Sequence, residues 1–186
     1  MRIVAGTHRG RPLLGPRGPG LRPTADRVRE SLFNVLGQFF EGGEVLDLFA
    51  GTGALAFEAL SRGATRALLV DQGAEAARLI AENARALGLE GAIEVWRMPV
   101  ARALGRLGSG GPRFRLVFAD PPYAQAAVEE VVRGVGEGRL LVEGGTLVVE
   151  HGRRETAPDA LGGLRRVDQR RFGDTLVTLY RSATVP

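Results

Sequence analysis

The stretch Val45-Leu46-Asp47-Leu48-Phe49-Ala50-Gly51-Thr52-Gly53 decides the fold that we expect for this chain. An apolar run that leads into two closely spaced glycines predicts a buried strand turning directly into a helix. Apolar runs and helical patterns then alternate up to residue 150, and this order predicts a mostly parallel sheet with helices on both faces. The sequence therefore predicts an α/β fold.

The expected elements can be placed along the chain from the period of the apolar residues. Strands are expected at residues 44–49, 67–71, 92–97, 116–120, 145–150, 164–171 and 175–180. Helices are expected at residues 24–39, 52–61, 74–87, 100–107 and 124–135. The last two strands flank Gly173-Asp174 and predict an antiparallel C-terminal hairpin.

Composition limits the classes of function. The chain has 186 residues, 44% of them hydrophobic and 25% charged, which favours a single domain spanning residues 1–186. It has no apolar run of the roughly 18 residues that a membrane span requires, and its opening does not resemble a secretory signal, so we expect a cytoplasmic protein. We also expect it to be a monomer. Without cysteine and with only two histidines, thiol chemistry is excluded and no metal site is expected.

Three segments differ in character: a basic N-terminal arm (residues 1–22), a helix (residues 23–40) and a catalytic core (residues 44–181). Short β-like stretches at residues 2–5 and 11–14 predict a β-hairpin arm. The chain lacks lysine, and its first 30 residues carry seven arginines against two carboxylates: Arg2, Arg9, Arg11, Arg17, Arg22, Arg27 and Arg29. Such an asymmetry indicates polyanion binding, although a solvated basic surface would read the same way.

The expected helix at residues 24–39 is amphipathic. Thr24 is a candidate N-cap. Its apolar stripe, which should be buried, consists of Val28, Leu32, Val35, Leu36 and Phe39. Arg27 and Arg29 lie off this stripe and should be exposed.

The glycine turn has the spacing of a nucleotide-binding site. Gly51, Gly53 and Ala56 satisfy the G-x-G-x-x-A pattern, and Asp71 follows 20 residues after Gly51, where it could accept from ribose hydroxyls. These marks alone would suit NAD. Asp47 favours a different ligand, because a carboxylate at this position repels a pyrophosphate and attracts an ammonium or sulfonium group. S-adenosylmethionine carries both groups.

The residues from Asp47 to Gly53 resemble the first motif of the Rossmann-like S-adenosylmethionine-dependent methyltransferases. The resemblance implies that Phe49 and Ala50 belong to the cofactor site. Gln72, after the presumed ribose acid, could face the adenine. Many relatives place an acidic or amide side chain after the third strand, but this chain has Met98-Pro99-Val100 there, so Pro99 is expected to contact the cofactor through backbone and apolar groups.

A second motif, Asp120-Pro121-Pro122-Tyr123, ends another expected buried strand. Ligands of doubly wound folds bind beyond such strand ends. An exocyclic base amine is a poor nucleophile, and hydrogen-bond acceptors for its N–H groups stabilise the charge that it develops. We expect the Asp120 carboxylate and the Pro121 carbonyl to accept these bonds, the prolines to fix the backbone, and Tyr123 to stack on the base. Asp120 should also border the cofactor.

The chain resembles the bacterial 16S ribosomal RNA guanine-N2 methyltransferase family over nearly its whole length. The residues that carry the resemblance are Ile3 to Gly6, Arg9-Gly10-Arg11, Arg22 to Asn34, Asp47 to Gly53 and Asp120 to Tyr123. The resemblance implies a seven-stranded sheet, methylation of guanine N2 in 16S rRNA, and the small ribosomal subunit or its assembly intermediate as substrate. It further implies that Thr24 closes over the methionine end of the cofactor and that Arg9, Arg11 and Arg22 contact RNA.

Other functions remain as alternatives. A DNA or RNA adenine-N6 methyltransferase can use the same tetrapeptide, but reading a DNA sequence usually takes an added module, for which this chain has little length. A protein-glutamine methyltransferase fits this chain less well, because the motif of those enzymes resembles Asn-Pro-Pro-Tyr rather than the aspartate version. A non-catalytic, cofactor-binding RNA chaperone would have a damaged tetrapeptide, whereas Asp120 to Tyr123 is intact.

Overall fold

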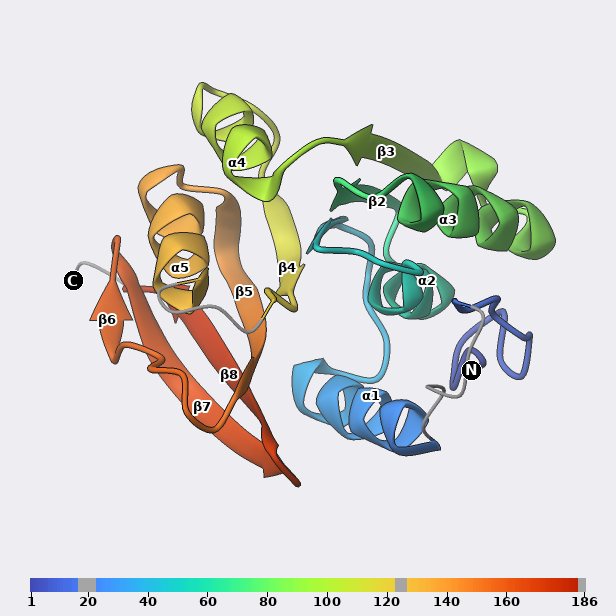
Figure 1. Cartoon of the computed structure of the whole chain (residues 1–186), viewed down its shortest axis with the longest axis horizontal. Coiled ribbons are helices and arrows are strands. Elements are labelled where there is room, and N and C mark those ends of the chain that lie inside the picture. Colours follow the sequence, from blue (N-terminus) through green and yellow to red (C-terminus); the bar gives the residue numbers. More distant parts are fainter. Residues whose placement is uncertain (17–22, 123–126, 184–186) are drawn as a thin grey trace. The chain divides into compact units, whose positions relative to one another are not determined.

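Strands and helices alternate from Glu44 to Gly152, as the sequence predicts (Figure 1). The computed structural model describes residues 1–16, 23–122 and 127–183, and the side chains of residues 23–27 are outside this description. The chain divides into two units, Met1–Arg97 and Met98–Pro186. Among the described residues, no helix is long and apolar enough to cross a membrane.

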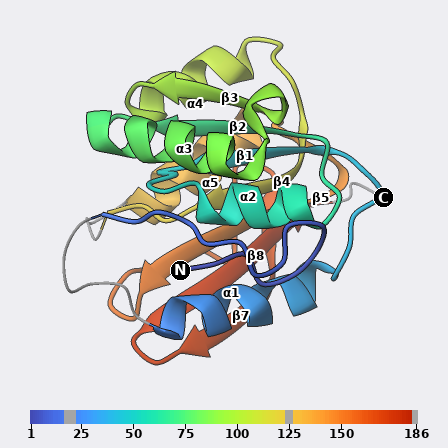
Figure 2. The same cartoon turned by 90° about the vertical axis from the view of Figure 1, so that its right-hand side faces the viewer.

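The first unit is a parallel sheet with helices. Its elements are α1 (Pro23–Leu36), β1 (Glu44–Leu48), α2 (Ala54–Ser61), β2 (Arg66–Asp71), α3 (Ala74–Leu87), the 3₁₀ helix η1 (Glu90–Ala92) and β3 (Ile93–Arg97). The strands lie in the order β3-β2-β1 and pair in parallel. Helix α2 packs on β1 and β2, and α3 packs on β3, so that both helices lie in front of these strands in Figure 2.

Burial explains why β1 and β2 are mostly apolar, with Asp47 as the polar exception in β1. Residues 45–48 and 67–70 are all buried, although successive side chains of a strand point to opposite faces. Both faces of these strands are therefore covered, which is typical of parallel sheets. The carboxyl ends of β1 and β2 carry the turn that holds the candidate cofactor residues.

The second unit combines a parallel and an antiparallel part. Its elements are α4 (Val100–Gly108), β4 (Phe114–Ala119), α5 (Ala127–Glu137), β5 (Leu141–Gly152), β6 (Ala160–Leu161), β7 (Leu164–Phe172) and β8 (Thr175–Ser182). The strands lie in the order β4-β5-β8-β7-β6, with β4 and β5 parallel and the other pairs antiparallel. The C-terminal hairpin is confirmed, and the two-residue β6 adds to the seven strands expected.

The N-terminal arm is a hairpin held by few backbone bonds. The amide of Ile3 donates to the carbonyl of Arg11 at 3.0 Å, and the amide of Gly10 donates to the carbonyl of Ile3 at 2.9 Å. An antiparallel bridge joins Arg2 and Pro12. The expected hairpin is therefore present, but it is too short to form strands of its own.

Helix α1 differs from the expectation at both ends. It begins at Pro23, so Thr24 lies inside the helix and is not its N-cap; proline is favoured at a first helical position because its missing N–H would have no partner there. The helix ends at Leu36, and Gly37 follows with φ 110°. Phe39 is 68% exposed, so its predicted burial is wrong, because the chain leaves the helical path before reaching it. Phe40 is buried instead.

Candidate cofactor and catalytic sites

The turn between β1 and α2 has a left-handed backbone at three positions. Phe49, Gly51 and Gly53 have φ angles of 61°, 54° and 77°. This conformation suits glycine, whereas for a residue such as Phe49 it costs on the order of 1–3 kcal/mol and is found mostly at functional sites. A Cβ atom on Gly53 would also lie 2.7 Å from the ring of Phe57. The strand-turn-helix geometry expected of a nucleotide site is therefore present.

Asp71 holds this turn from the end of β2. Its Oδ2 accepts from the amide of Gly51 at 3.0 Å, and its Oδ1 accepts from the amide of Gly73 at 2.8 Å. The residue is only partly buried, and each carboxylate oxygen can accept a further bond. Asp71 can therefore support the turn and still accept from a ribose hydroxyl, which remains a prediction. Gln72 is exposed beside it.

Asp47 is nearly fully buried, with 3% of its surface exposed. Its Oδ2 accepts from the amide of Ala56 in the first turn of α2 at 3.2 Å. A carboxylate in this position is stabilised by the unpaired amides and the dipole at the start of the helix. Asp47 thus has a structural role that the sequence interpretation did not include, and its expected role beside the cofactor remains a prediction.

The negative charge of the turn fits S-adenosylmethionine better than a dinucleotide. Two carboxylates, Asp47 and Asp71, are tied to the turn, and no basic residue occurs between Glu44 and Ser61. Negative charge here favours an ammonium or a sulfonium and disfavours a pyrophosphate. Ala50 belongs to the same turn, and its amide donates to the carbonyl of Val70 in β2 at 3.0 Å.

The remaining candidate cofactor residues are less well defined. Thr24 lies in α1, but its side chain is outside the described part of the structure. Pro99 is exposed and immediately precedes α4, in the second unit. Their contacts with a cofactor remain predictions from the resemblance.

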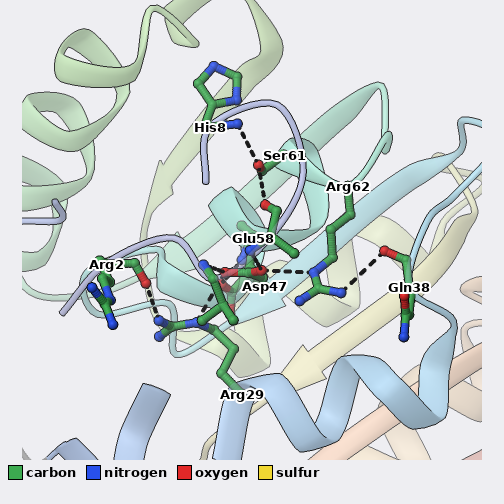
Figure 3. Close-up of polar contacts among 11 residues, drawn as sticks. Arg2, His8, Arg29, Gln38, Asp47, Glu58, Ser61 and Arg62 are labelled. Atoms are coloured by element: carbon green, nitrogen blue, oxygen red, sulfur yellow. Dashed lines mark hydrogen bonds and ion pairs between the residues drawn. The ribbon is translucent and has the colours of Figure 1, made fainter. Parts of the chain in front are cut away.

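A buried carboxylate, Glu58 of α2, holds the arm and α1 in place (Figure 3). It has no exposed surface, and it accepts from the amides of Val4 at 2.8 Å and Ala5 at 3.0 Å. Its carboxylate also contacts Nε of Arg62 at 2.8 Å and Nε of Arg29 at 3.4 Å. One carboxylate thereby compensates two buried guanidinium groups, since buried charges need such partners.

Arg29 is buried, so the expectation that it would be exposed is wrong. Only 4% of its surface is accessible, and besides contacting Glu58 it donates to the carbonyl of Arg2. It therefore links α1 to the arm. The sequence signal that could have indicated this is Glu58 itself, a lone carboxylate in the otherwise apolar and small-residue helix Ala54–Ser61.

The candidate RNA contacts fall on the arm. Arg9 and Arg11 are exposed, as RNA binding requires, and Nη2 of Arg11 donates to the carbonyl of Ala86 at 3.0 Å. Arg22 lies outside the described residues. The arm is fixed to α2 at Gly6, where a Cβ atom would lie 1.8 Å from the carbonyl oxygen of Ser61. The two described arginines are therefore presented by an anchored segment.

Asp120 directly follows β4, as predicted, in the second unit. Pro121 is buried and Pro122 is exposed, whereas Tyr123 lies outside the described residues. The register pairs Ala119 with Val149, which places Asp120 next to Glu150 at the carboxyl ends of two neighbouring parallel strands. This is the edge where α/β folds bind ligands.

The protonation of Asp120 is altered first by desolvation and second by a neighbouring carboxyl group. The residue has exposed surface, but neighbouring protein reduces the hydration of its carboxyl; this desolvation, together with repulsion from Glu155, raises the pKa of Asp120 to about 6. Desolvation and then repulsion from Asp120 raise the pKa of Glu150 to about 7. Perturbed carboxyls of this kind mark candidate active sites. The sequence interpretation missed Glu150 and Glu155. Among the described residues, no group of three or more potential ligands could hold a metal ion.

Comparisons with known proteins cover nearly the whole chain. The family model described as conserved hypothetical protein 95 matches residues 1–181. The putative rRNA methyltransferase YlbH of Bacillus subtilis (strain 168) is 37% identical over 181 residues, covering 97% of this chain and 98% of the relative. Ribosomal RNA small subunit methyltransferase D of Escherichia coli (strain K12) is 37% identical over 150 residues, covering 81% and 74%. The solved structure of the putative methyltransferase yhhF from Escherichia coli has 32% identity and a TM-score of 0.78, covering 98% and 97%.

Proposed function

The chain belongs to the conserved hypothetical protein 95 family, and from the resemblance of its motifs to those of the bacterial 16S rRNA guanine-N2 methyltransferases we propose that it methylates the exocyclic N2 of a guanine in 16S rRNA. It is a methyltransferase that uses S-adenosylmethionine, and its curated relatives are named rRNA methyltransferases. The observation that carries the proposed amine chemistry is the position of Asp120 and Pro121 directly after β4. The small ribosomal subunit or its assembly intermediate is the proposed substrate, and a cytoplasmic monomer the proposed form.

The cofactor would be held by the turn after β1. Asp47 and Asp71 provide negative charge near the ammonium and sulfonium groups and an acceptor for ribose hydroxyls. Gly51 leaves room for a ligand to approach the backbone, because a Cβ atom there would meet nothing closer than the carbonyl oxygen of Phe49 at 4.0 Å, whereas Gly53 allows close packing against Phe57. When bound, S-adenosylmethionine would supply the methyl group and leave as S-adenosylhomocysteine, and the surplus proton of the methylated amine would pass to water.

The Asp120 carboxylate accepts a hydrogen bond from the target amine. With a pKa of about 6, it is mostly ionised at neutral pH and can accept from an N–H group that gains positive charge as the N–C bond forms. The Pro121 carbonyl accepts from the second N–H, and Pro122 restricts the backbone that carries it. These bonds strengthen in the transition state, so they increase kcat more than they increase binding.

Nucleoside analysis tests this proposal directly. Small ribosomal subunits from a strain lacking the gene would be incubated with the protein and labelled S-adenosylmethionine, then digested to nucleosides. We expect label in N2-methylguanosine. Label in N6-methyladenosine would support the alternative adenine reaction, and unlabelled rRNA would refute the proposed function.

A variant comparison then tests the role of Asp120. Asp120→Ala should lower kcat on the order of 10²–10³-fold, because one preorganised acceptor is lost, with little change in cofactor affinity. Asp174→Ala is a suitable control, since this aspartate of the same unit has a 97% exposed side chain. Near-normal turnover in Asp120→Ala would contradict the mechanism.

A further inference from the structure

We propose that Asn83 of α3 is a positioning residue that couples the cofactor turn to the RNA-binding arm. This inference depends on the proposed function, in which the arm contacts RNA. Its consequence is that occupation of the cofactor site and RNA binding strengthen each other through one buried amide side chain.

Three hydrogen bonds join Asn83 to the two segments. Its Oδ1 accepts from the amide of Leu14 at 2.7 Å, and its Nδ2 donates to the carbonyl of Leu14 at 3.1 Å. The same Nδ2 donates to the carbonyl of Thr52 at 3.0 Å. Leu14 belongs to the arm and lies 69 residues away in the chain, whereas Thr52 stands between the two glycines of the turn.

Asparagine is suited to this position because it offers two donors and an acceptor on one short planar group. Asn83 has no exposed surface, and both of its N–H groups and its oxygen have partners. Asn83 bonds to both the amide and the carbonyl of Leu14, as a backbone residue of a neighbouring strand would. Aspartate would keep the bond from the Leu14 amide but place a carboxylate against two carbonyl oxygens.

The bond to Thr52 completes the restraint of one peptide unit of the turn. The amide of Gly53 donates to the carbonyl of Ala50 at 2.7 Å, and Asn83 holds the carbonyl of Thr52 at the other end of the same peptide. Asp71 separately holds the amide of Gly51. Among the described contacts, the side chain of Asn83 therefore links the orientation of this peptide to the arm.

The arm is attached so that a change at Leu14 reaches Asn83. Its first half is anchored to α2 through Glu58 and Ser61 (Figure 3). Its second half lies along α3, where Arg11 donates to the carbonyl of Ala86 one turn beyond Asn83. RNA that orders the arm would therefore favour one arrangement of Leu14 and Asn83, and a cofactor that orders the turn would favour the same arrangement. Such shared ordering produces positive coupling without a large structural change.

The test measures RNA affinity with and without S-adenosylhomocysteine, using small subunits from a strain lacking the gene. In the wild-type protein we expect S-adenosylhomocysteine to lower the Kd for the particles by roughly 5- to 150-fold, the usual range of coupling between sites. In Asn83→Ala and Asn83→Asp this ratio should fall toward one. Asn34→Ala, which changes the chain's other asparagine at an exposed position of α1, should retain the wild-type ratio.

The ratio separates coupling from a general structural role. A variant that is merely less stable would bind both forms more weakly and keep the ratio. A second measurement uses the wild-type protein alone: S-adenosylhomocysteine should slow hydrogen exchange of the Leu14 amide, because that amide is bonded to Asn83. Unchanged exchange at Leu14, a wild-type ratio of one, or a wild-type ratio in the folded Asn83 variants would overturn the inference.

Failure of the inference can be distinguished from failure of the proposed function. If the wild-type protein produces N2-methylguanosine but shows no coupling, the proposed function stands and the role of Asn83 is refuted. If the particles are neither bound nor methylated, both are refuted.

Discussion

Replacing Glu58 by glutamine should be among the most destabilising single changes in the first unit. The substitution preserves shape but removes the charge that compensates the guanidinium groups of Arg29 and Arg62, which are only 4% and 3% exposed. It also turns an amide group toward donors. Removing one partner of a buried ion pair typically costs about 3–5 kcal/mol, because the other charge stays buried without compensation.

That cost is large relative to the roughly 5–15 kcal/mol that stabilises a typical domain. With a urea m-value of about 2 kcal/mol/M, the unfolding midpoint followed by circular dichroism should fall by about 2 M. Hydrogen exchange should also accelerate at the amides of Val4 and Ala5, which donate to this carboxylate.

The matched control is Glu82, which also pairs with an arginine four residues away but on the surface. Its contact with Arg78 is 2.7 Å long, and the two side chains are 37% and 50% exposed. Glu82→Gln should change stability by less than about 1 kcal/mol. If Glu58→Gln is no more destabilising than Glu82→Gln, the argument from the buried network is refuted.

Three further predictions concern the arm and the carboxyl cluster. Gly6→Ala should destabilise the protein more than Gly10→Ala, because both glycines have positive φ but only the new Cβ at Gly6 meets backbone, at 1.8 Å; equal urea midpoints would contradict this. Glu150→Gln should flatten the pH dependence of the free energy of unfolding. The raised pKa of Glu150 stabilises the wild-type protein below the unfolded pKa, and this stabilisation is lost as the pH rises toward about 7. The variant should therefore become more stable relative to wild type between pH 5 and 8, and parallel stability curves for the two proteins would contradict this prediction. Glu155→Gln should move the acid limb of the methylation rate to lower pH, because it removes the repulsion that helps raise the pKa of Asp120; an unmoved limb would show that Glu155 does not act on this carboxyl.

The turn and the tetrapeptide could be predicted because their signals are local. The apolar run before Gly51 and Gly53 predicts a buried strand and a turn that requires positive φ, and both features depend on residues adjacent in the chain. Asp120 follows a run that had to be a buried strand, so its position at the carboxyl edge follows from the topology. The contacts that these residues make with cofactor and RNA remain predictions.

The end of α1 shows where local periodicity fails. Phe39 continues the helical spacing, but Gly37 allows the chain to turn away after Leu36, and the adjacent Phe40 becomes the buried ring. Periodicity does not say where a helix stops, since the last turn is decided by what the following residues can pack against.

Only the tertiary structure shows the network that holds the arm. An arginine on an amphipathic helix is predicted to be exposed, because burying its charge without a partner is unfavourable. Glu58 lies 29 residues from Arg29 and 54 from Val4 in the chain, and Asn83 lies 69 from Leu14. By itself the sequence determined the strands, the turn and the motif residues, whose burial and backbone geometry are local properties. The partners of the buried polar groups were decided by the fold, because pairing depends on which distant segments it brings within hydrogen-bonding distance.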